Sequence, residues 1–139
     1  MNIHVLATWL ACRIRKQAPT MIVMHATAGS SAAGAIATLK ARGLSYHYII
    51  EKDGRIDKCV PVSRIAFHAG VSYGPREEAA HLAAVRNPGV FTPTVKCVND
   101  YSIGISFVNR NDGKDPYTRA QFDAAVELIK ELKPGGIRW

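Results

Sequence analysis

His25 has the residue type and the position of a metal-binding or catalytic group. It closes the apolar run 21–24, which predicts a buried central strand, and small residues follow it at 26–31. An imidazole at the end of such a strand suits a metal ligand or a general base. A histidine hydrogen-bonded inside the core is the alternative interpretation.

Tyr46 offers a second chemical group. It lies in the alternating run 45–50, whose period places it on one face with Tyr48 and Ile50 and places His47 on the other. Its hydroxyl can donate a hydrogen bond to an oxygen that gains negative charge. A tyrosine packed on a half-buried face fits the pattern equally well. We interpret His47 as structural because it points away from the Tyr46 face.

Two further polar groups lie at the ends of predicted elements. His68 follows Phe67 at the entry to a polar stretch, and the pair Asn99-Asp100 precedes the alternating run 102–108. With His25 and Tyr46 they form the set of candidates for a site. The other histidines, at positions 4 and 81, have no partner in the pattern and are predicted to lie on the surface.

The elements that would position these groups can be predicted from local signals. Ser30 or Ser31 caps a helix over 32–42, with Ile36 and Leu39 inward and Gly43 as its stop. The turn Asp53-Gly54 joins the strand 45–50 to a strand over 56–60 as a hairpin.

The second half of the chain predicts a strand and a helix. Alternation over 102–108 indicates a strand, and a turn over 109–115 follows it. A capping box from Thr118 to Gln121 begins a helix. Its predicted inward residues are Phe122, Ala125, Val126, Ile129 and Leu132. Residues 72–96 lack a period and predict a long loop. This order implies an α/β fold in which helices pack on a mixed, twisted sheet.

Length and charge limit the class of protein. The 139 residues suit one domain spanning 1–139, and the net charge of +7 favours an anionic partner. The dense basic cluster Arg13, Arg15 and Lys16 has no interleaved aromatic residues, so we expect a solvated basic face and no nucleic-acid partner.

Cysteines and the amino-terminal segment indicate the compartment. Cys12, Cys59 and Cys97 are odd in number and lack metal-binding spacing, which predicts buried or free thiols in a reducing compartment. The apolar run 5–12 is too short to cross a membrane, and its positive charges follow it. We therefore expect cytoplasmic synthesis with no signal peptide and no transmembrane segment.

Five motifs occur in an order typical of one family. They are Ile22–Gly29, Tyr46–Gly54, Phe67–Ser72, Asn99–Ile105 and Tyr117–Gln121. In this order the chain resembles the zinc-dependent N-acetylmuramoyl-L-alanine amidases over about residues 22–139. This superfamily includes phage endolysins, bacterial recycling amidases and animal peptidoglycan recognition proteins.

The resemblance implies hydrolysis of the amide between N-acetylmuramic acid and the L-alanine of the stem peptide. The implied partners are peptidoglycan and muropeptides, at the bacterial cell wall for an endolysin-like protein. By motif, His25 would be a zinc ligand and Tyr46 the catalytic tyrosine. The same comparison of motifs makes His68, Asn99 and Asp100 substrate-binding residues.

The chain departs from the family pattern at two places. Ser106 occupies the position where many recycling-type members have a catalytic glutamate. This difference argues against a glutamate-based mechanism and favours Tyr46 as the catalytic group. The family's other two zinc ligands are expected after Trp139, where the printed sequence stops. Because catalytic zinc needs three protein ligands, the printed chain is expected to be inactive. A non-catalytic peptidoglycan-binding module and a regulatory interaction protein on the same fold are the alternative functions.

Overall fold

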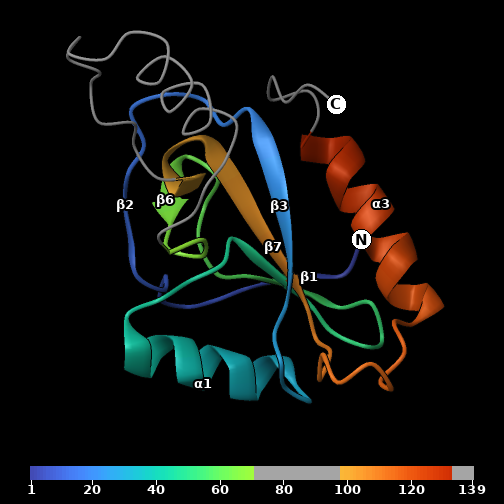
Figure 1. The fold of residues 1–139 in the computed structure, drawn as a ribbon. Coiled ribbons are helices and arrows are strands. Elements are labelled where there is room, and N and C mark those ends of the chain that lie inside the picture. The colour runs from blue at the N-terminus through green and yellow to red at the C-terminus, as the bar shows by residue number, and fades with distance from the viewer. Residues whose placement is uncertain (71–97, 133–139) are drawn as a thin grey trace, which may run out of the picture.

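The computed structural model describes residues 1–70 and 98–132, and their fold is built on one mixed sheet. Five strands lie in the order β1-β5-β4-β7-β3 (Figure 1). Their bounds are β1 Ile3–Val5, β5 Ile56–Lys58, β4 Tyr48–Ile50, β7 Ser102–Phe107 and β3 Met21–Ala26. Only the pair β4–β5 is antiparallel within this sheet. The predicted mixed sheet with helices packed on it is confirmed.

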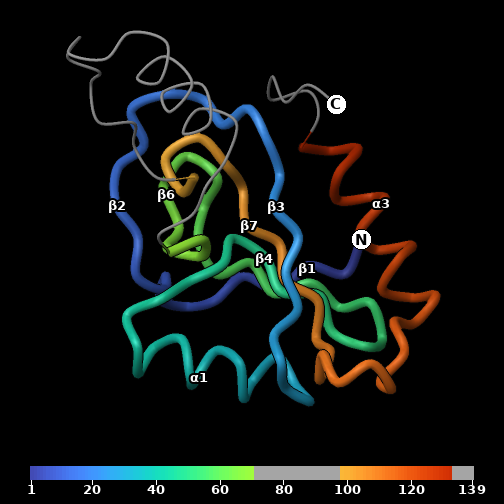
Figure 2. The backbone as a smooth tube through the Cα atoms, viewed as in Figure 1, coloured from blue at the N-terminus to red at the C-terminus, as the bar shows by residue number. Residues whose placement is uncertain are grey.

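Strand β7, and not β3, is an interior strand of the described sheet, between β4 and β3. All six residues of β7 are buried, whereas β3 lies at the edge of the described sheet and Met24 is exposed. The strand predicted over 21–25 is therefore confirmed, but its central, buried position was wrong. Figure 2 shows β3 and β7 running side by side, in register from Met21 opposite Ser102 to Ala26 opposite Phe107.

Two helices cover opposite faces of the sheet. Helix α1, Ala32–Arg42, and helix α3, Arg119–Leu132, each pack on a separate buried cluster. The α3-side core consists of Tyr48, Ile50, Ile56, Ile103, Ile105, Phe107, Ala125 and Leu128. The α1-side core consists of Leu10, Ala32, Leu39, Ile49, Cys59, Val60, Ala66 and Val108. Successive residues of β4 thus alternate between the two cores, as a pleated strand requires.

Three helix ends predicted from capping signals, the two ends of α1 and the start of α3, are confirmed. The Ser31 hydroxyl accepts from the Gly34 backbone N–H at 3.1 Å, and Gly43 takes the left-handed conformation at φ 65°. Thr118 and Gln121 bond each other's backbone N–H groups at 3.1 and 3.0 Å. These reciprocal bonds satisfy amides that have no partner within the first helical turn.

The predicted inward face of α3 was partly wrong. Phe122 and Val126 are 53% and 51% exposed, while Gln121 and Leu128 are buried. The Gln121 side-chain amide donates to the carbonyls of Ile50 and Val108 at 3.2 and 2.9 Å. These bonds hold Gln121 inward and turn the helix so that Phe122 and Val126 point outward.

The predicted hairpin is present and anchors helix α1. Strands β4 and β5 pair with Ile50 opposite Ile56, and Gly54 takes a positive φ of 88° at the turn. The Glu51 carboxylate accepts from the Ala32 backbone N–H at 2.7 Å. A carboxylate at a helix N-terminus is favourable because it faces the positive end of the helix dipole. The hairpin therefore fixes where α1 begins.

The amino-terminal strands and one ribbon were not predicted. Strand β1 and the antiparallel pair of β2, Cys12–Ile14, with β6, Arg64–Ala66, have only three residues each, too few to show a period. A short 3-10 helix, η1, spans Val98–Tyr101. Cys12 and Cys59 are free thiols, while Cys97, His81 and the loop predicted over 72–96 lie outside the described residues.

The basic cluster is not a uniformly solvated face. The Arg15 guanidinium donates to the carbonyls of Val62, Arg64, Asp100 and Ser102, at 2.9, 3.1, 3.2 and 2.9 Å. Arg13 forms an ion pair with Asp100, and of these three residues Lys16 alone is exposed with no such partner in the described part of the chain. Arg15 therefore ties β2 to β6 and to the start of β7. No helix in the described ranges is long and apolar enough to cross a membrane.

Candidate active site

The rings of His25 and Tyr46 lie against each other. Their centroids are 5.1 Å apart with the planes tilted by 46°, and both side chains are half-buried. His25 comes from the end of β3, and Tyr46 from the segment before β4. The structure therefore brings together the two residues that the sequence predicted to share a site.

Tyr46 reaches His25 because the predicted strand starts later than expected. Strand β4 begins at Tyr48, and Tyr46 packs on the α1-side core instead of sharing the face of Tyr48. The period-two placement of Tyr46 with Tyr48 and Ile50 was therefore wrong. Tyr46 borders a hollow of about 510 Å³ along α1, lined mostly by small and polar residues of 27–38.

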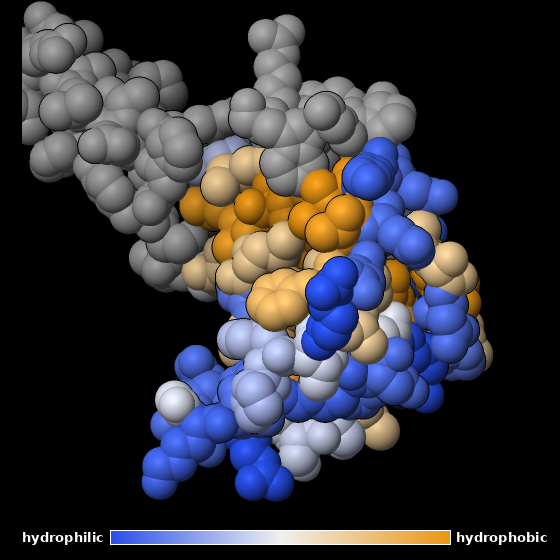
Figure 3. Space-filling view, turned by 90° about the vertical axis from the view of Figure 1, so that its right-hand side faces the viewer, coloured by the Kyte–Doolittle hydropathy of each residue, from blue (hydrophilic) through white to orange (hydrophobic). Residues whose placement is uncertain are grey.

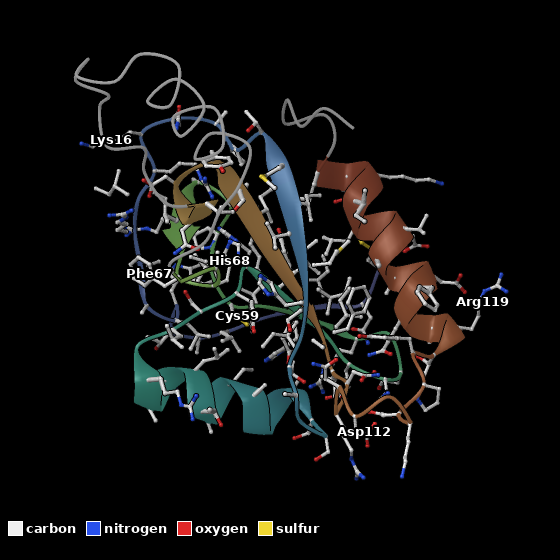
Figure 4. All side chains as sticks on the ribbon, viewed as in Figure 1. Lys16, Cys59, Phe67, His68, Asp112 and Arg119 are labelled. Carbon is white, nitrogen blue, oxygen red and sulfur yellow. The ribbon has the colours of Figure 1, made fainter. Side chains whose placement is uncertain are left out.

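His68 is the third ring of the site. Its Nδ1 lies 2.9 Å from Nε2 of His25, and its Nε2 lies 3.0 Å from the hydroxyl of Ser102. Figure 4 shows His68 toward β7, with its neighbour Phe67 on the side of β2. A Cβ on Gly104 would approach the His68 ring to 2.5 Å, so the ring occupies the space that the glycine leaves.

His47 lies behind this group and is structural, as predicted. Its ring is fully buried, with its centroid 6.2 Å from that of His68. The Gly104 backbone N–H donates to Nδ1 at 3.0 Å, so Nε2 carries the proton that it donates to the Arg64 carbonyl at 2.8 Å. These bonds join β7 to β6 through one imidazole.

All three histidines of this region are neutral at neutral pH. Burial lowers the pKa of His68 to about 3, with further lowering from His25, His47 and Arg15. Burial also lowers the pKa of His47 to about 4 and depresses the pKa of His25. Neutral imidazoles keep a lone pair on one ring nitrogen, which metal binding or proton acceptance requires.

Asn99 and Asp100 are buried and have partners within the fold. The Asn99 side-chain oxygen accepts from the backbone N–H groups of His68 and Ala69 at 3.1 and 2.9 Å. Asp100 pairs with Arg13. The 3-10 helix therefore holds the segment that carries His68, while the predicted contact of these two residues with substrate stays a prediction.

A second hollow borders His25 on the α3 side of the molecule. It measures about 430 Å³ and is lined by Met24, His25, Ala26, Phe107, Asn111, Tyr117 and Phe122. The Tyr117 ring contacts Phe107 and Phe122, with centroids 5.6 and 6.1 Å apart. Figure 3 looks onto the α3 side and shows apolar surface gathered beside strongly polar surface.

Small residues of β7 make room for the histidine rings, and sequence reasoning missed this. Ser102, Gly104 and Ser106 alternate with Ile103 and Ile105, which belong to the α3-side core. Ser106 lies opposite His25 in the strand register, and its buried hydroxyl has no partner in the described part of the chain. The signal was visible as small residues at every second position of an otherwise apolar strand.

The described residues do not complete a metal site by themselves. Within 1–70 and 98–132, no group of three His, Cys, Asp or Glu side chains could hold a metal ion. His25 and His68 come close together, but they amount to fewer than the three ligands of catalytic zinc.

The fold and the site define an α/β protein with an imidazole and a phenol in contact at a sheet edge. Residues 15–137 match the N-acetylmuramoyl-L-alanine amidase family, and the chain belongs to that family. The activity in the family's name is hydrolysis of the amide between N-acetylmuramic acid and L-alanine. The predicted family, enzyme class and peptidoglycan-cleaving function are therefore confirmed.

Individual relatives agree with this membership. The 1,6-anhydro-N-acetylmuramyl-L-alanine amidase AmpD of Enterobacter cloacae is 28% identical over 151 residues, covering 93% of this chain and 68% of the relative. The amidase LysC from Clostridium intestinale is similar in structure, with a TM-score of 0.65, 26% identity and coverage of 97% of this chain and 77% of that chain.

A more distant structure shares the fold alone. Drosophila peptidoglycan recognition protein SA has a TM-score of 0.62 at 16% identity, covering 97% of this chain and 74% of that chain. The predicted recognition-protein-like architecture is therefore confirmed at the level of fold.

Proposed function

We propose that His25 and Tyr46 form the catalytic pair of this amidase, with His25 as a zinc ligand. The observation that carries the proposal is the ring contact at 5.1 Å between these two half-buried side chains. Tyr46 can then donate a hydrogen bond to the oxygen of the scissile amide as it gains negative charge. We assign this step to the tyrosine because Ser106 has no carboxylate that could act in its place.

Zinc fits the site as far as its described residues extend. His25 supplies a neutral imidazole, which is a common zinc ligand, and the remaining ligands would come from residues outside the described ranges. Bound zinc would lower the pKa of a coordinated water to about 7 and so supply hydroxide near neutral pH.

Peptidoglycan is the proposed partner, at the bacterial cell wall. The hollow beside Tyr46 is open and bordered by small residues such as Gly29 and Gly34, which leave room for a polymer chain. The net charge of +7 favours approach to anionic wall polymers. Asn99 would act on substrate mainly through the segment of His68, because its buried side chain bonds that segment, while buried Asp100 would act through its ion pair with Arg13.

The test combines metal analysis with turnover on muropeptides, on the intact protein produced from the complete gene. His25→Ala should abolish zinc uptake and the release of peptides that begin with L-alanine. Tyr46→Phe should keep zinc but slow release by roughly 10²–10³-fold, the scale of one lost oxyanion donor. Tyr48→Phe is the matched control, because Tyr48 lies in the α3-side core away from His25.

Two outcomes would contradict the proposal. Equal turnover by Tyr46→Phe and the unchanged protein would remove Tyr46 from the mechanism. Binding of muropeptides with neither zinc uptake nor turnover would instead identify a non-catalytic binding module.

A further inference from the structure

A chain of hydrogen bonds leads from the backbone of η1 to the His25 ring. It begins at the Val98 carbonyl, which lies 2.7 Å from the Ser102 hydroxyl. A carbonyl oxygen only accepts hydrogen bonds, so the single hydroxyl proton of Ser102 points toward Val98. The Ser102 oxygen is then left as an acceptor for any other partner.

His68 is that other partner, and the bond determines which nitrogen carries its proton. Nε2 of His68 lies 3.0 Å from the Ser102 oxygen and must donate to it. In a neutral imidazole the other nitrogen, Nδ1, then has a lone pair and no proton. This bare Nδ1 faces Nε2 of His25 at 2.9 Å, so His25 Nε2 is the donor of that bond.

We propose that His68 is a positioning residue that, held by Ser102, fixes His25 as the tautomer with its proton on Nε2. Nδ1 of His25 keeps the free lone pair, and it has no hydrogen-bond partner among residues 1–70 and 98–132. A metal-binding histidine commonly donates its second ring N–H to a neighbouring acceptor, which orients the ring. The use of Nδ1 for zinc rests on the proposed function, whereas the tautomer itself does not.

The surroundings of His68 make it a rigid acceptor. The Asn99 side-chain oxygen accepts from the His68 backbone N–H at 3.1 Å. The His68 ring lies so close to Gly104 that a Cβ added to this glycine would overlap it. A ring held on both edges by directed bonds and on its face by backbone has little freedom to rotate. This role differs from the substrate contact predicted for His68, and also from direct metal ligation by its Nδ1.

The decisive measurement is nitrogen-15 NMR of the five histidines in the metal-free protein near neutral pH. We expect His25 and His68 each to show a protonated Nε2 and an unprotonated Nδ1. His4→Gln serves as the control, because exposed His4 lies on β1 and its replacement should leave the His25 signals unchanged. A proton on Nδ1 of His25, or a rapidly averaged pair of tautomers, would overturn the proposal.

Two amide variants, each placing a polar atom where one ring nitrogen lies, separate positioning from ligation. In His68→Asn the side-chain oxygen lies as many bonds from Cβ as Nδ1 does, so it can still accept from His25. In His68→Gln the amide takes the place of Nε2 and leaves His25 without an acceptor. We expect His68→Asn to keep the single tautomer and His68→Gln to lose it.

Zinc affinity of the intact protein from the complete gene, measured by competition with a chelator, gives a second readout. We expect His68→Gln to bind zinc roughly 10–100-fold more weakly, as is typical for loss of an outer partner of a ligand, and His68→Asn to bind almost normally. Equal loss in both variants would show that His68 is itself a ligand and would overturn the proposal. The predicted tautomer in a protein without zinc uptake or turnover would refute only the proposed function. The wrong tautomer in an active protein would refute only this inference.

Discussion

Gly104→Ala tests the packing of the site most directly. The added Cβ would lie 2.5 Å from Cγ and 2.6 Å from Cδ2 of the His68 ring. Carbon atoms in van der Waals contact lie roughly 3.5–4 Å apart, so the ring or the strand must move by about 1 Å. Overpacking of this kind costs about 1–3 kcal/mol of folding free energy.

The cost should depend on the presence of the imidazole. In a His68→Ala background the space over β7 is free, and the alanine at 104 should then be tolerated in the middle of a strand. Denaturant unfolding of the single and double variants gives the coupling free energy between the two positions. We expect the double variant to be more stable than the sum of the single effects by about 1–3 kcal/mol.

Additivity would refute this reasoning. If the two single effects sum to the double effect within about 0.5 kcal/mol, the glycine does not accommodate the ring. Ser106→Ala is the control on the same face of β7, because it adds no carbon and removes a buried hydroxyl without a described partner. It should not destabilise the fold.

Three further predictions concern stability. Because the pKa of His47 falls from 6.5 to about 4 on folding, the unfolded chain binds a proton at this residue first, so the His47 contribution to stability should be complete above pH 6.5 and fall by about 3 kcal/mol as the pH drops to 4. His68, whose pKa falls to about 3, adds a further loss over this range, so His47→Gln should reduce the loss in acid unfolding curves without abolishing it. Arg15→Met should lower the free energy of unfolding in urea by about 3 kcal/mol, because four carbonyls lose their donor. Its control, Lys16→Met on the surface, should change this free energy by less than about 0.5 kcal/mol. Equal effects of the two variants would contradict the structural role of Arg15. Thr118→Ala should lower the free energy of unfolding by about 1 kcal/mol and Thr118→Ser by much less, because only alanine removes the hydroxyl that caps the helix. Equal thermal unfolding of the two variants would show that this cap does not stabilise the fold.

Local signals in the sequence were enough where neighbouring residues determine the conformation. Ser31 marks the start and Gly43 the end of helix α1, and the Thr118 capping box marks the start of α3. Asp53-Gly54 forms the turn of the hairpin. Each of these rests on backbone bonds within a few residues, so no distant contact was needed to predict them. The five motifs in order were likewise enough to predict the family.

Burial depended on the packing of distant segments. Periodicity predicted that Phe122 and Val126 face inward, but Gln121 bonds two carbonyls of the sheet and turns the helix away from that orientation. Strand β7 has the alternation of a half-exposed strand, yet it is buried on both faces. Ile103 and Ile105 belong to the α3-side core, and the rings of His68 and His47 cover the other face.

The sequence by itself determined which residues could do chemistry, since His25, Tyr46 and His68 follow from residue type and position. Only the tertiary structure decided how they meet. Parallel pairing of β3 with β7 and the late start of β4 bring segments more than twenty residues apart within 5.1 Å. The proton positions on the His25 and His68 rings likewise depend on Ser102 and Val98, because a tautomer is fixed by its hydrogen-bond partners and not by the residue type.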